Sequence, residues 1–240
     1  MRLITHHVGS FLGRKKWYDR IVKPFRFILG YRKLQYLNIE VERKLKSQIA
    51  ADIVILQDIH FRGKNNIPQI ELFRSNLIQD IKTLTPFTQY CEPSIIPTVP
   101  KTYTVASFSK FPTKVVKMTV NSHLIETSIN ELSILSIHLS KKNKHRREQL
   151  RFIEGYINQN IHRKYIVVGC FNIKRLKELN SLITNCSLYK ATNSPTYPAN
   201  NPKLFSSLIL YDNSIILSAT NVIQQSISDH LPIYCDFELR

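Results

Sequence analysis

Polar side chains able to do chemistry fall at the ends of apolar segments along the chain. Asp58, His138 and Asn172 each close such a segment, and the pair Asp229-His230 directly precedes the last one. If these strand ends share one edge of a sheet, the carboxylates, imidazoles and amide converge. Carboxylate oxygens bind Mg²⁺ or Mn²⁺, and histidine transfers protons, and both kinds of group are used by enzymes that cleave phosphate esters with a divalent cation.

The stretch 164–172 ends with a thiol at a position where this chemistry needs an acid. Its four apolar residues suit a strand covered on both faces, and Gly169 frees the backbone to turn. Cys170 follows. A thiol with a pKa of about 8.5 is mostly neutral at pH 7, so it is a poor ligand for Mg²⁺ and a poor acceptor for a proton from water. An inert core thiol is the alternative interpretation.

Strands and helices predicted along the chain must position these side chains. Apolar runs and turn residues predict strands at 2–8, 52–58, 103–109, 114–120, 123–130, 132–140, 164–170, 204–211, 214–223 and 231–239. Helical spacing predicts helices at 34–50, about 73–84, about 143–160 and near 175–183. The strands between 103 and 140 are expected to form an antiparallel meander, and the proline-marked stretch 86–100 is expected to be irregular.

These elements together predict an α/β fold. Strands at both ends, with helices between some strands and hairpins between others, suit two mixed β-sheets stacked face to face with helices on the outside. The sequence has no internal repeat and no low-complexity linker. A single domain over residues 1–240 is therefore expected.

The charge balance favours an anionic partner. The net charge is +17, from 34 Lys and Arg against 17 Asp and Glu, which suits nucleic acid, phospholipid headgroups or a phosphorylated molecule. Basic residues gather at 14–46, among aromatic residues, and at 141–151. Within the second segment, Arg146 and Arg147 are expected to face outward and bind the anion. A merely solvated basic surface is the alternative.

Cysteine usage and hydropathy bear on the compartment. The four cysteines show no close-paired metal spacing, so reduced thiols in a cytosol are expected. No run reaches the roughly 20 apolar residues of a membrane span, and the N-terminus lacks a signal segment. A soluble cytoplasmic protein is expected, with secretion by a route that leaves no such signal as the alternative.

Five short motifs occur in a fixed order along nearly the whole chain. They are Leu56-Gln57-Asp58, Ser109-Lys110-Phe111-Pro112, Ile137-His138-Leu139, Val168-Gly169-Cys170-Phe171-Asn172 and Ser228-Asp229-His230-Leu231-Pro232-Ile233. This order resembles the endonuclease/exonuclease/phosphatase superfamily, and Thr196-Tyr197-Pro198 is similar to its small bacterial members. The resemblance implies the DNase I-like four-layer sandwich and a bacterial hydrolase.

The resemblance also implies roles for five residues. Asp58 stands in place of the family's metal-binding glutamate, and Asp229 lies with it near the metal. His138 contacts the phosphate or serves as the acid, and Asn172 contacts the phosphate. His230 is the acid/base or the group that stabilises the transition state. Two plainer interpretations stay open: Asp229 as a turn cap and His138 as a core histidine.

Three positions depart from the family pattern. His7 replaces an asparagine, Cys170 replaces the aspartate that activates water, and Ser207 replaces the aspartate that pairs with the final histidine. Asp212 is a poor substitute for the last of these, since its odd spacing from Ser207 places it on the other side of a regular strand. All three exchanges make the pocket a weaker cation site and a better anion site.

Two functions follow from these features. The first is a Mg²⁺- or Mn²⁺-dependent phosphoesterase with a degraded active site, which hydrolyses phosphodiesters, nucleic acid among them, or phosphomonoesters and holds its metal weakly. The second is a catalytically weak or inactive pseudoenzyme that binds nucleic acid or anionic phospholipid headgroups, as a peripheral membrane contact, through its basic surface.

Overall fold

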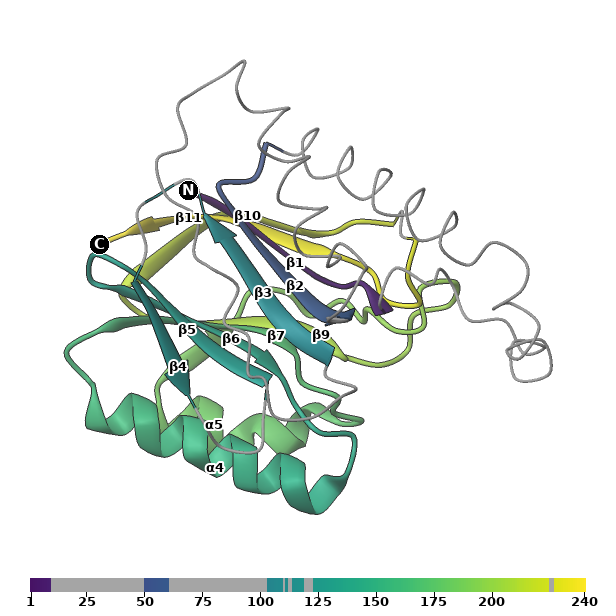
Figure 1. Cartoon of the computed structure of the whole chain (residues 1–240), viewed down its shortest axis with the longest axis horizontal. Helices are drawn as coiled ribbons and strands as arrows, with labels where there is room; N and C mark the ends of the chain where they lie inside the picture. The colour runs from purple at the N-terminus through teal and green to yellow at the C-terminus, as the bar shows by residue number, and fades with distance from the viewer. Residues whose placement is uncertain (10–49, 61–102, 110, 112–113, 119–122, 225–226) are drawn as a thin grey trace, which may run out of the picture.

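Two mixed β-sheets form the framework of the chain (Figure 1). The computed structural model describes residues 1–9, 50–60, 103–109, 111, 114–118, 123–224 and 227–240. Among these, one sheet has the order β10-β11-β1-β2-β3 and the other β4-β5-β6-β7-β9-β8. The pairs β1–β2 and β6–β7 are parallel, and the remaining described pairings are antiparallel.

The strands follow the predicted segments closely. The first sheet consists of β1 (Arg2–His7), β2 (Ile53–His60), β3 (Tyr103–Ser109), β10 (Ile215–Val222) and β11 (Ile233–Leu239). The second consists of β4 (Lys114–Met118), β5 (His123–Ile129), β6 (Leu132–His138), β7 (Lys164–Cys170), β8 (Leu188–Lys190) and β9 (Ser207–Asp212). The short strand β8 was not predicted, because three residues are too few to show a period.

The inner faces of the two sheets pack on each other. One continuous buried cluster includes Leu3 and Ile55 of the first sheet with Ile134, Val168 and Ile209 of the second. Each such side chain contributes about 1.5–3 kcal/mol when it is fully buried. The predicted α/β sandwich is thereby confirmed, and its inter-sheet core ends where the polar strand ends begin.

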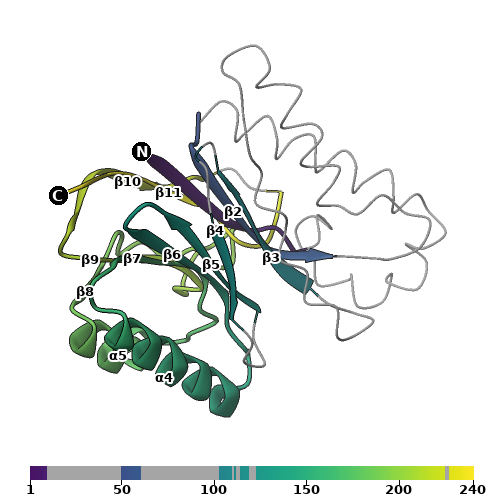
Figure 2. The ribbon, with the colours of Figure 1, turned by 60° about the vertical axis from the view of Figure 1, so that its left-hand side comes forward.

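Helices cover the outer face of the second sheet (Figures 1 and 2). In α4 (Asn143–Gln159), Leu150, Ile153 and Ile157 recur at helical spacing and face the sheet, as predicted. The helix predicted near 175–183 divides into the 3₁₀ turn η2 (Leu176–Leu179) and the short helix α5 (Asn180–Asn185). No helix among the described residues is long and apolar enough to cross a membrane.

The predicted four-strand meander is wrong for its first strand. β3 pairs with β2 in the first sheet, and only β4, β5 and β6 form a meander among the described strands. Alternating polarity predicts a strand but not its sheet, and the β2 edge takes β3 as its partner. The predicted helices at 34–50 and 73–84, the basic segment 14–46 and the proline-marked stretch 86–100 lie outside the described residues, except for the turn residue Ala50.

The two ends of the described chain are joined in one sheet. The Arg2 guanidinium forms a two-pronged ion pair with Asp236 at 2.6 and 2.7 Å, which links β1 to β11. The antiparallel pairing of β1 with β11 places the C-terminal end of β1 beside the segment that leads into β11. Both pieces contribute to the site described next.

Candidate functional site

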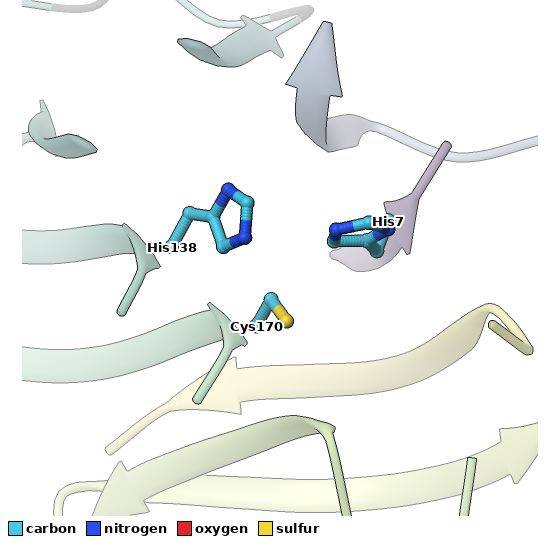
Figure 3. Close-up of side chains that lie close together, drawn as sticks. All are labelled: His7, His138 and Cys170. Carbon is cyan, nitrogen blue, oxygen red and sulfur yellow. The ribbon is translucent and has the colours of Figure 1, made fainter. Parts of the chain in front are cut away.

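A row of site residues lies across neighbouring strands of the second sheet. The register pairs His138 with Cys170 and Cys170 with Ser207. Because side chains alternate along a strand, all three share the face of the inter-sheet core residue Val168. Figure 3 shows His138 and Cys170 extending from adjacent strands toward His7, which comes from β1 of the opposite sheet. The predicted convergence of strand ends is therefore observed for these residues.

Three imidazoles meet in this pocket. The His7 ring stacks on that of His230, with centroids 4.1 Å apart, and meets His138 edge-on at 5.0 Å. The Tyr197 ring packs against His230, with ring centroids 4.6 Å apart. Burial, together with the charges of His230 and His138, holds the pKa of His7 well below its ordinary value. His7 is therefore a neutral imidazole.

Two carboxylates flank His7. Asp58 has φ 63° where the register between β2 and β3 shifts, and its Oδ2 is 3.8 Å from His7 Nε2. Asp229 Oδ1 is 3.9 Å from His230 Nε2 and accepts a hydrogen bond from Ser228 Oγ at 3.3 Å. Carboxylates are the ligands that Mg²⁺ and Mn²⁺ prefer, and one or two of them suffice for a hydrated ion. Asp58 and Asp229 thus supply oxygen donors of the type that such an ion binds.

Cys170 places sulfur on the same wall. The side chain is fully buried, and its Sγ is 3.5 Å from Ser206 Oγ. Burial raises the pKa of the Cys170 thiol to about 11, so it is protonated at neutral pH and accepts no proton from water. The ligand atoms of His7, His138 and Cys170 lie within 4.8 Å of one another, as do those of His7, Asp229 and His230.

Ser207 brings no carboxylate to the histidines. It is fully buried, and its backbone N–H donates to Thr196 Oγ1 at 3.0 Å. Asp212, at the far end of β9, accepts backbone hydrogen bonds from Ser214, at 2.8 Å, and from Tyr165. Its carboxylate is thus used in the turn between β9 and β10. This agrees with the prediction that Asp212 does not replace an acid at position 207.

The turn after β7 depends on two unusual backbone positions. Gly169 has φ 135°, and a Cβ there would lie 2.1 Å from the carbonyl oxygen of Ile137. Asn172 has φ 52°, and its Nδ2 donates to the carbonyl oxygen of Leu139 at 2.7 Å. The side-chain amide thus holds the turn after β7 against the turn after β6. The phosphate contact expected of Asn172 remains a prediction.

Arg146 does not face outward, which corrects the prediction for this residue. It is 4% exposed, its Nη2 is 2.6 Å from Glu178 Oε2, and it donates to the carbonyl oxygen of Ser140. Burial opposes ionisation of Glu178, but hydrogen bonds from Arg146 and from the N–H groups of Lys174 and Arg175 hold its pKa below the ordinary value. Arg146 joins three segments instead of offering a free cation for an anion.

Arg147, the next residue, is exposed as predicted. A helix turns by about 100° per residue, so neighbours face different environments. Three further exposed basic residues lie near Arg147 at the start of α4, directly after the turn that follows His138. They are Lys141, Lys142 and Lys144. These four residues are called the α4 basic cluster below. Anion binding by Arg147 remains a prediction.

Three residues of the pocket were not predicted as site residues from the sequence. Lys141 is close enough for its charge to lower the pKa of His7. Tyr197 packs on His230, and Ser228 Oγ donates to the carbonyl oxygen of His7 at 2.6 Å. Tyr197 and Ser228 both stand within motifs named above, and these motifs could have indicated that the two residues belong to the site. Lys141 begins the basic segment 141–151 and lies three residues after His138, which was the signal for it.

Solved structures share this fold. An endonuclease/exonuclease/phosphatase family protein from Leptotrichia buccalis is 13% identical with TM-score 0.69, and 100% of both chains is covered. A Bacteroides thetaiotaomicron mannosyl-6-phosphatase is 12% identical with TM-score 0.63, again over 100% of both chains. A beta toxin variant from Staphylococcus aureus with bound magnesium ions is 16% identical with TM-score 0.65, over 98% of each chain. No protein-family model and no curated protein matches the sequence.

Proposed function

We propose, from the fold shared with endonuclease/exonuclease/phosphatase structures, that this protein binds phosphate esters in the histidine pocket and hydrolyses them slowly with a divalent cation. The supporting observation is that His138, Asp229 and His230 surround His7 at one end of the sandwich. Imidazoles and carboxylates at one edge are the groups that phosphate-ester hydrolysis uses. The phosphatase and magnesium-binding neighbours support the same class of reaction.

The cation would be Mg²⁺ or Mn²⁺, held by Asp58 and Asp229. When bound, it supplies positive charge to the phosphate and lowers the pKa of its water. His230, with Asp229 beside it, is placed to hold or donate a proton at Nε2. His138 is half-buried at the same wall and is placed to contact a phosphate oxygen. Asp58 is shorter by one methylene than the glutamate of the family pattern, which favours weak metal binding.

Low activity is expected because two acids of the family pattern are replaced. The protonated Cys170 thiol accepts no proton from water, and Ser207 leaves His230 without the second carboxylate of that pattern. Removal of a comparable carboxylate partner slows a catalytic histidine by about 10⁴-fold in one well-studied triad. The reaction proposed here is therefore slow.

The second candidate is binding without hydrolysis. It is favoured by the same protonated thiol and by the exposed α4 basic cluster next to the pocket. Removing acids from a pocket rimmed by lysines improves its affinity for anions. The partner would be nucleic acid or the headgroups of anionic phospholipids at a membrane surface.

Hydrolysis assays separate the two candidates. An aryl phosphodiester, plasmid DNA and a sugar phosphate are incubated with the protein and Mg²⁺, Mn²⁺ or EDTA. The phosphoesterase predicts metal-dependent turnover that Asp229→Ala reduces by at least about 100-fold. Glu148→Ala removes an exposed acid from α4 and is the matched control, expected to keep full activity. Absence of turnover with every substrate and metal would favour the binding protein.

A further inference from the structure

The wall formed by β6, β7 and β1 carries a nitrogen and sulfur donor set, of which the phosphoesterase proposal uses only His138. We infer that His7, His138 and Cys170 form a site for a thiophilic divalent cation, with Zn²⁺ the best match. Nitrogen and sulfur donors select zinc over magnesium, whereas carboxylates and water suit magnesium. This inference does not rest on the proposed function, because the ion binds whether or not a phosphate ester is cleaved.

The spacing of the three donors supports one shared ion. Their ligand atoms lie within 4.8 Å of one another. Zinc bonds of about 2.0–2.1 Å to nitrogen and 2.3 Å to sulfur place tetrahedral ligands roughly 3.4–3.7 Å apart. Closing the remaining gap needs small rotations of side chains that already point into one space (Figure 3). The three donors come from three strands, so strand pairing holds them in place.

A buried nitrogen of His7 gives a second, independent indication of a ligand. The residue is 3% exposed, and its Nδ1 has no hydrogen-bond partner among the residues that the structure describes. A buried polar atom without a partner costs roughly 1–3 kcal/mol. The Asp58 carboxylate, 3.8 Å from Nε2, is placed to orient the ring as carboxylates do in metal sites.

Binding requires only the removal of the thiol proton. The S–H bond of Cys170 breaks, the proton passes to solvent, and the sulfur electron pair forms the zinc–sulfur bond. No oxidation or reduction takes place. Ser206 Oγ, 3.5 Å from Sγ, is placed to donate a hydrogen bond to the resulting thiolate. Three protein ligands leave a fourth position for water or an anion, and the half-buried His138 marks the open side.

Cobalt titration tests this site without reference to hydrolysis. The full chain is stripped of metal with EDTA, reduced and titrated with Co²⁺, which reports thiolate ligation through a sulfur-to-cobalt absorption band in the near ultraviolet. We expect this band in the parent and its disappearance in Cys170→Ser. Zn²⁺, measured by competition with a chromogenic chelator, is expected to bind the parent and to bind Cys170→Ser at least about 10–100-fold more weakly.

Matched variants identify which cysteine is the ligand. Cys91→Ser and Cys186→Ser change two of the other three cysteines, and Cys235→Ala changes the third, which is buried in the core. All three variants should keep the band and the zinc affinity. His138→Asn, at the half-buried donor, gives a second test should Cys170→Ser fail to fold. The inference is overturned if the parent shows no band, or if folded Cys170→Ser or His138→Asn binds both metals like the parent. Hydrolysis without zinc binding would refute this inference alone, and zinc binding without hydrolysis would refute the proposed function alone.

Discussion

In the proposed phosphoesterase, the residue at position 170 would determine whether a proton can leave the attacking water. A carboxylate in a partly buried pocket stays ionised beside cations, whereas the Cys170 thiol, with a pKa of about 11, is protonated over the physiological range. The register places Cys170 directly beside Ser207 and His138. The residue type at this position would therefore affect both water activation in the proposed reaction and the environment of the neighbouring His138 imidazole.

Restoring both acids should raise hydrolysis. Cys170→Asp combined with Ser207→Asp supplies a proton acceptor and a second carboxylate near His230, and we expect Mn²⁺-dependent cleavage of an aryl phosphodiester to rise by about 10²–10⁴-fold. The initial rate at saturating metal is the measurement. Cys170→Ser with Ser207→Ala is the matched double variant without new acids. An unchanged rate in a double-Asp variant that melts like the parent would contradict the role given to these positions.

At the scale of single elements, Gly169 sets the distance between β6 and β7. Gly169→Ala would place a methyl group 2.1 Å from the Ile137 carbonyl oxygen, where the backbone cannot move without breaking the parallel pairing. We expect a decrease of at least about 3 kcal/mol in the free energy of unfolding, or no folded protein. Urea denaturation followed by circular dichroism measures it.

Gly155 is the control for this substitution. It lies inside α4, and a Cβ there would meet nothing within 4 Å. Gly155→Ala should raise the free energy of unfolding by about 0.5–1 kcal/mol, because alanine favours the helix. Equal effects of the two substitutions would contradict the close approach assigned to Gly169.

Arg146 and Arg147 give a second element-scale comparison. Arg146→Ala leaves Glu178 and the carbonyl oxygen of Ser140 without their buried cation, so we expect a decrease of about 2 kcal/mol in the free energy of unfolding. Arg147→Ala changes an exposed neighbour and should stay within about 0.5 kcal/mol of the parent. Urea midpoints measure both. A similar stability for both variants would mean that the Arg146–Glu178 pair contributes little.

The sequence predicts elements better than their partners. Strand ends at His7, His138 and Cys170 follow from runs of apolar, mostly β-branched residues, and the structure places them within two residues of the expected bounds. The sheet of β3 does not follow, because alternation describes one strand and not its neighbour. Arg146 could not be distinguished from Arg147 by residue type. Its burial depends on a partner, Glu178, that lies 32 residues away.

In the candidate site, too, the sequence predicts individual residues better than the contacts between them. The motifs indicated His138, Asp229 and His230, and the structure places them around His7. Spacing along the chain did not show that His7 stacks on His230, since these residues are 223 positions apart and meet only because the segment before β11 runs beside β1. A nitrogen and sulfur donor set becomes visible only when three strands are seen together.

At the scale of the whole molecule, net charge is the dominant electrostatic property. The value of +17 gives a long-range attraction for anions, and the α4 basic cluster concentrates part of it beside the pocket. Each lysine that neutralises a phosphate releases a counterion, so the affinity for nucleic acid depends on salt with a slope of about 0.9 per neutralised phosphate on logarithmic axes. A salt titration therefore reports how many phosphates the protein neutralises.

Removing two of these charges should change the slope by a defined amount. Lys141→Gln with Lys144→Gln is expected to lower the salt slope for a double-stranded DNA by about 0.9 for each phosphate that these lysines neutralise in the parent, as measured by fluorescence anisotropy between low and moderate salt. Lys164→Gln with Arg240→Gln removes the same charge from the ends of β7 and β11 that lie away from the pocket, where Lys164 Nζ donates to the Arg240 carbonyl oxygen at 2.6 Å. This control should keep the parent slope, because a lower net charge alone leaves the lysine–phosphate pairs at α4 intact.

Equal changes in both pairs of variants would mean that the anion is attracted by net charge and not held at the α4 basic cluster. Anionic vesicles that bind in preference to the DNA would identify a membrane surface as the partner.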